Sequence, residues 1–171
     1  MKVLIKIILF LFMAGHSSLL LAQAKPKTMP MHADSMSHVM MRAANLKWMN
    51  APPGLPPGAK VAVLSGDPSK EGTFTIRLML PANYTVKPHW HPTDENITVV
   101  KGTLYMGMQE TFNKEKATRL NEGDFARMPA RSVHYAFSKT PVTVQIHGMG
   151  PFAITYIKAS DDPRNSKMKM P

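Results

Sequence analysis

Three histidines and one glutamate stand at spacings that suit a metal ion. The segment from Pro88 to Glu95 reads Pro-His-Trp-His-Pro-Thr-Asp-Glu. Side chains alternate between the two faces of a strand, so His89 and His91 are expected to point the same way. Proline, threonine and aspartate at 92–94 then turn the chain, which lets Glu95 return a carboxylate toward the same point. The segment therefore predicts two imidazoles and one carboxylate around a single ion.

A third imidazole, His134, lies in a second β-rich run at residues 132–137. Three neutral imidazole nitrogens and one carboxylate oxygen suit Fe(II), Mn, Ni, Cu(II) or Zn, and they leave coordination positions open for water or substrate. The chain has no cysteine, which excludes a Cys-ligated zinc or iron–sulfur site and a catalytic thiol. The predicted cofactor is one divalent metal ion bound by His89, His91, Glu95 and His134.

The elements that must position these ligands are short strands. Eight β-rich runs are separated by turn signals, at residues 61–64, 73–80, 95–100, 103–108, 125–128, 132–138, 142–147 and 152–157. Only residues 112–119 could hold a helical turn or two, so the βαβ alternation of a parallel sheet is missing. The sequence predicts an all-β fold, an antiparallel sandwich or barrel.

The spacing of the candidate ligands resembles that of the cupin superfamily. The run His89-x-His91-x3-Glu95-x6-Gly102 is similar to the first cupin motif, and Gly123-x5-Pro129 followed by His134 is similar to the second. The resemblance implies an antiparallel jelly-roll β-barrel, the double-stranded β-helix of cupins. It also implies that the two histidines of the first motif, its glutamate and the histidine of the second bind the metal.

Three positions depart from the family's motifs. Asn83 stands where the first motif opens with glycine, Arg131 where the second has another glycine, and Ser138 where the second ends in asparagine. None of the three is a ligand position. The departures therefore put the geometry of local turns in question rather than metal binding.

The resemblance implies a metal-dependent enzyme that acts on a small organic molecule. Dioxygenase-type chemistry on a chelated substrate is the commonest reaction of cupins with this ligand set, while isomerisation or hydrolysis would use the metal as a Lewis acid. The alternative is a non-catalytic metal- or ligand-binding cupin, for copper handling or for sensing, like the zinc-binding cupin domains of anti-sigma factors. A homodimer is a further habit of the family.

Four polar residues near the motifs are candidates for the pocket. Gln145 and His147 share one face of the run 142–147, so they either face solvent or line a polar pocket in which His147 would act as a general acid or base. Arg77 either faces solvent or clamps an anion. Tyr105 offers either a packed ring or a pocket hydroxyl.

The N-terminus predicts export. Residues 1–24 read as a signal peptide, with Lys2 and Lys6 before an apolar run at 7–13 and an Ala-Gln-Ala exit that predicts cleavage near Ala24. Residues 25–44 form a predicted flexible leader, whose stretch 28–41 holds five methionines and two histidines. Those side chains suit Cu(I), or they are simply tolerated in an unstructured leader. Residues 45–160 are the predicted cupin domain and 161–171 a C-terminal tail.

The chain length and the net charge limit the kinds of partner that we expect. The chain has 171 residues, enough for one domain, and 21 Lys+Arg against 11 Asp+Glu give a formal charge of +10. The basic residues are scattered, as is typical of a solvated surface. We expect a periplasmic or secreted protein with no stable membrane span after cleavage and no nucleic-acid partner. Attraction to anionic ligands or to a membrane surface stays open.

Overall fold

A computed structural model describes residues 38–166 of the chain. The predicted signal peptide, most of the predicted leader and the last five residues of the predicted tail lie outside the described residues. Within 38–166, no helix is long and apolar enough to cross a membrane. The helices are the 3₁₀ turns η1 (Ala43–Asn45), η2 (Lys114–Lys116) and η3 (Ala159–Asp161) and the short α1 (Pro163–Ser166).

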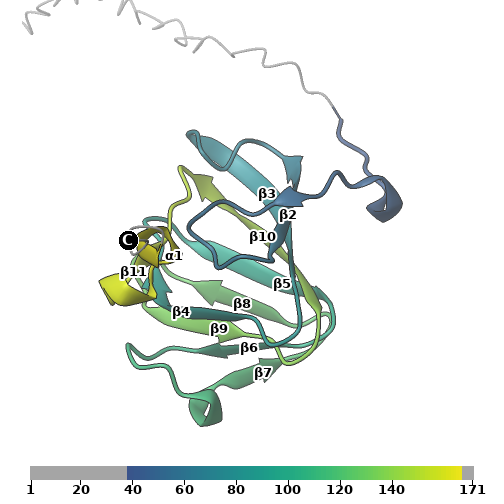
Figure 1. Ribbon diagram of the computed structural model, residues 1–171. Coiled ribbons are helices and arrows are strands. Elements are labelled where there is room, and N and C mark those ends of the chain that lie inside the picture. The colour runs from purple at the N-terminus through teal and green to yellow at the C-terminus, as the bar shows by residue number, and fades with distance from the viewer. Residues whose placement is uncertain (1–37, 167–171) are drawn as a thin grey trace, which may run out of the picture. The chain divides into compact units, whose positions relative to one another are not determined.

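Two antiparallel sheets make up the domain (Figure 1). The six-stranded sheet has the order β1 (Met49–Asn50), β2 (Lys60–Ser65), β3 (Gly72–Leu80), β10 (Val142–Gly150), β5 (Glu95–Lys101) and β8 (Phe125–Met128). The five-stranded sheet has the order β11 (Thr155–Tyr156), β4 (Thr85–Trp90), β9 (His134–Phe137), β6 (Leu104–Gly107) and β7 (Thr118–Leu120). This arrangement confirms the predicted all-β jelly roll.

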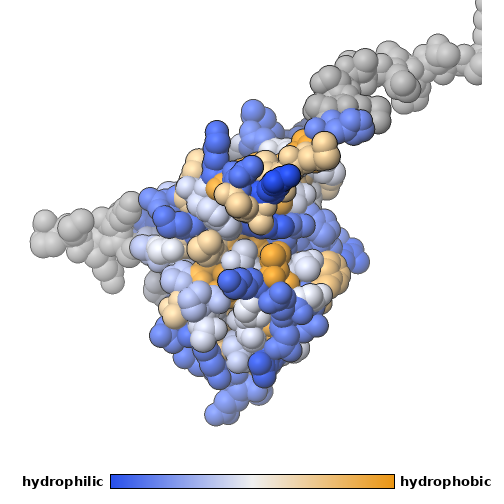
Figure 2. Space-filling model, turned by 90° about the vertical axis from the view of Figure 1, so that its right-hand side faces the viewer, coloured by the Kyte–Doolittle hydropathy of each residue, from blue (hydrophilic) through white to orange (hydrophobic). Residues whose placement is uncertain are grey.

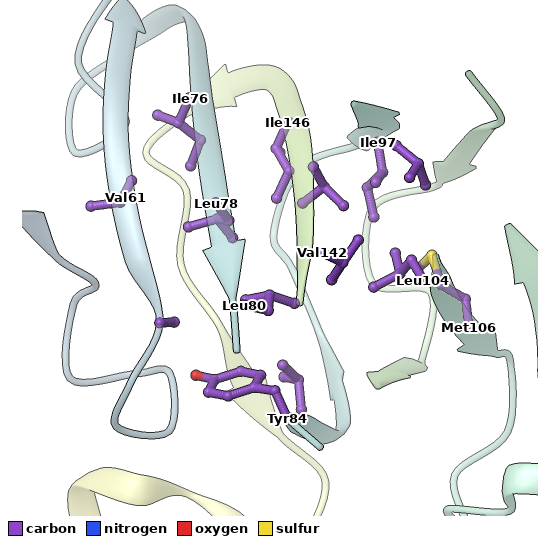
Figure 3. Close-up of a cluster of buried hydrophobic side chains, with 14 of the residues drawn as sticks. Val61, Ile76, Leu78, Leu80, Tyr84, Ile97, Leu104, Met106, Val142 and Ile146 are labelled. Carbon is purple, nitrogen blue, oxygen red and sulfur yellow. The ribbon is translucent and has the colours of Figure 1, made fainter. Parts of the chain in front are cut away.

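The core lies between the two sheets and follows from strand alternation. Along β10, Val142, Val144 and Ile146 are buried, while the residues between them are half-buried or exposed. Ile146 lies opposite Ile76 of β3 on one side and Ile97 of β5 on the other. Figure 3 shows these side chains gathered with those of β6 in one apolar cluster. Burying each such side chain contributes about 1.5–3 kcal/mol.

The strands differ from the eight expected runs in several places, and β1 and β4 lie outside those runs altogether. Residues 112–119 form η2 followed by the edge strand β7, not a longer helical turn. Only Thr155 and Tyr156 of the predicted run 152–157 are paired, with Trp90 and His89 of β4. The preceding residues instead contact the candidate metal ligands, as described below.

At the two positions where the cupin motifs have glycine and this chain does not, the turns keep the backbone conformation that glycine favours. Asn83 has φ 58° and Arg131 has φ 62°, so both adopt the left-handed conformation that favours glycine. The hydroxyl of buried Ser138 donates a hydrogen bond of 2.8 Å to the carbonyl of Pro81. The substitutions therefore leave these turns intact.

The surface of the domain carries scattered apolar residues. Figure 2 shows hydrophobic residues on one face as patches separated by hydrophilic ones. Exposed methionines and aromatic residues include Met49, Met79, Met149 and Phe125. Single exposed apolar residues of this kind are ordinary on a folded domain.

Candidate metal centre

The four predicted ligands meet between the two sheets. One ring nitrogen from each of His89, His91 and His134 lies within 4.8 Å of the others. Glu95 begins β5 in the opposite sheet, and its Oε2 lies 3.6 Å from His91 Nε2 and 3.2 Å from His134 Nε2. All four side chains are buried, with at most 6% of any residue exposed. The fold therefore brings the four candidate ligands together, and the three histidines alone could hold a metal ion.

A β-bulge brings His89 into this cluster. Thr85 and Val86 of β4 lie opposite Phe137 and Ala136, but His89 lies opposite His134, so β4 carries one extra residue over this stretch. Val86 and His89 both line the cavity although they are three positions apart. Strict alternation would have placed them on opposite faces, so the bulge changes the face on which the motif histidines lie.

Backbone carbonyls set the orientation of all three imidazoles. The Nδ1 atoms of His89, His91 and His134 lie 2.7, 2.7 and 3.0 Å from the carbonyl oxygens of Lys87, Ala153 and Ser132. A carbonyl oxygen only accepts, so each Nδ1 carries the proton and donates. Each Nε2 of a neutral ring is then left with a free lone pair, the form in which imidazole binds a metal.

With these tautomers, the atoms at the centre of the cluster are hydrogen-bond acceptors without a donor. The Nε2 of His91 and the Oε2 of Glu95 are fully buried and have no hydrogen-bond partner. With the protons on Nδ1, the contacts of Glu95 with His91 and His134 bring acceptor against acceptor. Buried acceptors without a donor are costly. A bound cation would satisfy them together, so the donor set fits one divalent metal ion.

The protonation states at neutral pH are those of metal ligands. Burial lowers the pKa of His89 to about 3, and the neighbouring imidazoles of His134 and His91 lower it further. Burial also lowers the pKa of His91. At neutral pH the His89 and His91 imidazoles are therefore uncharged, as metal binding requires.

The ligands line a cavity of about 570 Å³ inside the barrel. Its wall is largely aliphatic, with contributions from both sheets such as Leu78, Val144, Leu104 and Met106. Figure 3 shows several of these side chains directed toward the space between the sheets. Outside the ligand cluster, Asp67 is the one fully charged side chain among the described residues that line the cavity. The cavity suits a small, mostly apolar molecule.

The segment after β10 supports His91, and sequence reasoning missed it. The ring of Phe152 stacks on His91 with a centroid distance of 4.3 Å and an interplanar angle of 17°, and Ala153 accepts the Nδ1 hydrogen bond. Both residues also line the cavity. They were expected to continue a strand. No local pattern distinguishes them, because their partner lies about 60 residues away in the chain.

The four polar pocket candidates lie outside the cavity, so of the two alternatives for each the one in which it lines the pocket is wrong. Arg77 and Gln145 are opposite each other on β3 and β10, and Arg77 Nε donates to Gln145 Oε1 at 3.3 Å. His147 is exposed on the same outer face, so it does not reach the metal ligands. Tyr105 stacks on Phe137 at 4.8 Å on the outside of the other sheet. The reason is that aliphatic residues at the alternate positions take the inward face.

Comparison with solved structures agrees with the fold. The polyketide cyclase RemF from Streptomyces resistomycificus is 14% identical with a TM-score of 0.62, over 79% of this chain and 95% of that chain. An acetylacetone dioxygenase from Acinetobacter johnsonii is 16% identical with a TM-score of 0.55, over 74% and 80%. An RmlC-like cupin from Shewanella frigidimarina NCIMB 400 is 14% identical with a TM-score of 0.52, over 66% and 91%. At such identities the likeness shows the fold alone.

The sequence itself is matched by one family model. No curated protein matches the chain significantly. The model described as the ChrR cupin-like domain matches residues 36–153, which include both motifs and all four candidate ligands. The chain therefore belongs to the ChrR cupin-like family of the cupin superfamily.

Proposed function

We propose that this protein is an exported, metal-dependent cupin enzyme that acts on a small and mostly apolar organic molecule, with dioxygenase-type chemistry. The observation that carries the proposal is the buried cluster of unsatisfied acceptors, His91 Nε2 and Glu95 Oε2, on the wall of an apolar cavity. A metal held there by His89, His91, Glu95 and His134 would face whatever the cavity contains.

The residues of the chain hold and shield the site. The backbone carbonyls of Lys87, Ala153 and Ser132 orient the three imidazoles, and the aliphatic wall excludes water and binds the apolar body of the substrate. When bound, a redox-active divalent metal would supply activation of a chelated substrate toward dioxygen. The substrate's polar group must therefore lie at the ligand cluster.

The described residues that line the cavity offer few other titratable groups, which favours oxygenation over isomerisation or hydrolysis, since those reactions need a positioned acid or base. Asp67 already accepts hydrogen bonds from Ser69 at 2.9 and 2.7 Å and pairs with Lys70 at 3.1 Å. The exposed His147 lies on the other side of the sheet. One solved structure of the same fold is named an acetylacetone dioxygenase, which is in keeping with this class of reaction.

The family match favours a second candidate, a non-catalytic sensor or metal binder. The matching model is named for the ChrR cupin-like domain, and a fold with a metal does not by itself define a reaction. Zinc would fit the same donor set and would not support redox chemistry. The identity of the metal therefore separates the two candidates.

The test is elemental analysis of protein recovered from its native cell envelope without added metal. On binding strength alone, the Irving–Williams order favours copper or zinc for a protein that folds after export. One iron, manganese, nickel or copper per chain, together with oxygen uptake on apolar substrates with a chelating oxygen pair, would support the enzyme. Stoichiometric zinc without oxygen uptake would support the sensor or binder. Recovery from the cytosol with an intact N-terminus would contradict export.

A matched pair of variants tests the site itself. His91→Ala removes one ligand and is expected to abolish stoichiometric metal in either candidate function. His147→Ala removes an exposed imidazole from the outer face and is expected to retain the metal. Full metal content in His91→Ala would refute the centre.

A further inference from the structure

The outer face of the five-stranded sheet carries a cluster of aromatic rings. Tyr105 of β6 stacks on Phe137 of β9 with an interplanar angle of 8°. Phe112 meets Phe137 edge-on at 5.8 Å and Tyr135 edge-on at 5.0 Å. The neighbouring residues along β6 and β9 line the cavity, so these rings lie on the opposite side of the sheet from the metal ligands.

Three lysines lie over these rings. The Nζ atom of Lys87 is 4.5 Å from the centroid of Phe112, that of Lys139 is 4.9 Å from Tyr105, and that of Lys114 is 5.7 Å from Phe137. They come from β4, from the turn after β9 and from η2. Cation–π attraction holds each ammonium group near a ring. We call these three lysines the cationic face.

No carboxylate among residues 38–166 forms an ion pair with the cationic face, although Glu110 and Glu115 lie in the segment that carries Phe112 and Lys114. The five strands of this sheet contain no aspartate or glutamate. The ion pairs that Lys and Arg form with carboxylates join other residues, Lys70 with Asp67, Arg127 with Asp94 and Arg164 with Asp162. Arg119, directly opposite Tyr105 in β7, adds a fourth cation. Even with Glu110 and Glu115 counted, these four cations leave the face with a net positive charge.

We propose that the cationic face adsorbs to an anionic lipid bilayer. Each of the three ammonium groups lies over a different ring of one sheet face, so together they suit a layer of anionic headgroups. Lysine at an interface with aromatic rings beneath it is a common arrangement at membrane surfaces. The proposal is independent of the reaction at the metal centre.

Two other occupants fit less well. Nucleic acid that stacks its bases on aromatic residues needs open ring faces, whereas these rings are covered by lysine ammonium groups. A second copy of the chain would bring the same excess of positive charge, and the two faces would repel each other. A bilayer with anionic headgroups has the complementary charge.

The experiment measures cosedimentation of the full chain with phosphatidylcholine vesicles, with and without phosphatidylglycerol. Residues 1–24 are apolar enough to bind both kinds of vesicle, so the readout is the ratio of the two partition coefficients. We expect a ratio well above unity that is lost at about 1 M salt, where the Debye length falls to about 3 Å. Each lysine near an anionic surface contributes about fivefold, so K87Q/K114Q/K139Q should lower the ratio about a hundredfold.

The control is K60Q/K101Q/K158Q, which removes the same charge from three exposed lysines elsewhere. Its ratio should stay much closer to that of the wild type. Three outcomes would each overturn the proposal. The first two are equal losses in the two triple variants and a wild-type ratio near unity. The third is a preference for single-stranded oligonucleotides over the vesicles that depends on the same lysines. Thermal unfolding and zinc uptake check that the variants fold. The single variant K139Q, at an exposed turn, should still lose about fivefold if the triple variant does not fold.

Discussion

His134 Nε2 lies 3.2 Å from Glu95 Oε2, and this contact joins β9 of one sheet to β5 of the other. The Nδ1 of His134 already donates to Ser132, so neither atom of the contact carries a proton to share. Two lone pairs therefore face each other in a buried place. A cation bound here would be held by ligands from both sheets, so metal binding would stabilise the whole barrel.

Metal removal is expected to destabilise the protein. A ligand that binds only the folded state adds about 2.7 kcal/mol when its free concentration is a hundred times its Kd. For a domain of this size that corresponds to a Tm several degrees higher. Calorimetry before and after chelation, with readdition of Zn²⁺, measures the shift. The His91→Ala variant should show none, and a shift of the same size there would place the bound metal elsewhere.

The substitution Glu95→Gln is expected to act in opposite directions on the two states. Without metal, the amide can donate a hydrogen bond to the free Nε2 of His134 and should stabilise the protein by about 1 kcal/mol. With metal, the loss of the negative charge should weaken affinity. Chemical denaturation of the metal-free protein and competitive metal titration measure the two effects. A metal-free variant less stable than the wild type would show that the carboxylate already has a proton donor.

Acid is expected to destabilise the metal-free protein below pH 6.5. Burial lowers the pKa of His89 from 6.5 to about 3, so between these values the unfolded chain binds a proton that the folded protein does not. Unfolding then takes up protons, and its free energy falls as the pH falls, by about 1.4 kcal/mol per pH unit for one such histidine. His91, whose pKa is also lowered by burial, acts in the same direction.

Denaturation curves at a series of pH values measure this slope. His89→Gln should reduce it by about one proton, while His147→Gln, on the exposed outer face, should leave it unchanged. A stability that stays constant from pH 6.5 to 4.5 in the metal-free wild type would contradict the neutral, buried state of the cluster.

Two motif glycines offer a comparison of conformational strain with steric clash. Gly102 and Gly123 have φ values of 87° and 89°, so alanine is strained by about 1–2 kcal/mol at either position. A Cβ at Gly102 would also lie 2.7 Å from the carbonyl oxygen of Pro141, whereas a Cβ at Gly123 meets nothing within 4 Å. Gly102→Ala should therefore cost clearly more unfolding free energy than Gly123→Ala. Equal losses would show that the turn at Pro141 moves aside without a cost in stability.

The ligand set could be predicted because it depends on short spacings. His89, His91 and Glu95 lie within seven consecutive residues, and the cupin resemblance added His134 from the second motif. What the spacing could not predict is the bulge in β4, since one extra residue leaves no mark in the alternation from His89 onward. The bulge depends on pairing with β9, which is about 45 residues further along the chain.

The environment of the outward-facing polar residues could not be predicted from the sequence either. Alternation indicates that Gln145 and His147 share a face, but it does not say whether that face meets a polar pocket or solvent. The barrel decides this, because its interior is filled from both sheets by aliphatic side chains such as Val144 and Ile146. If the polar face of this strand had turned inward, the core would have lost the apolar contacts of Val144 and Ile146.

The sequence by itself determined the kind of fold, the donor atoms available to a metal and the absence of any thiol. These depend on residue types and on periods of two to seven residues. The tertiary structure decided which nitrogen of each imidazole is free, that Phe152 covers His91, and that lysines gather over the rings around Phe137. The reason is physical: each of these depends on groups far apart in the chain that meet only when the two sheets close.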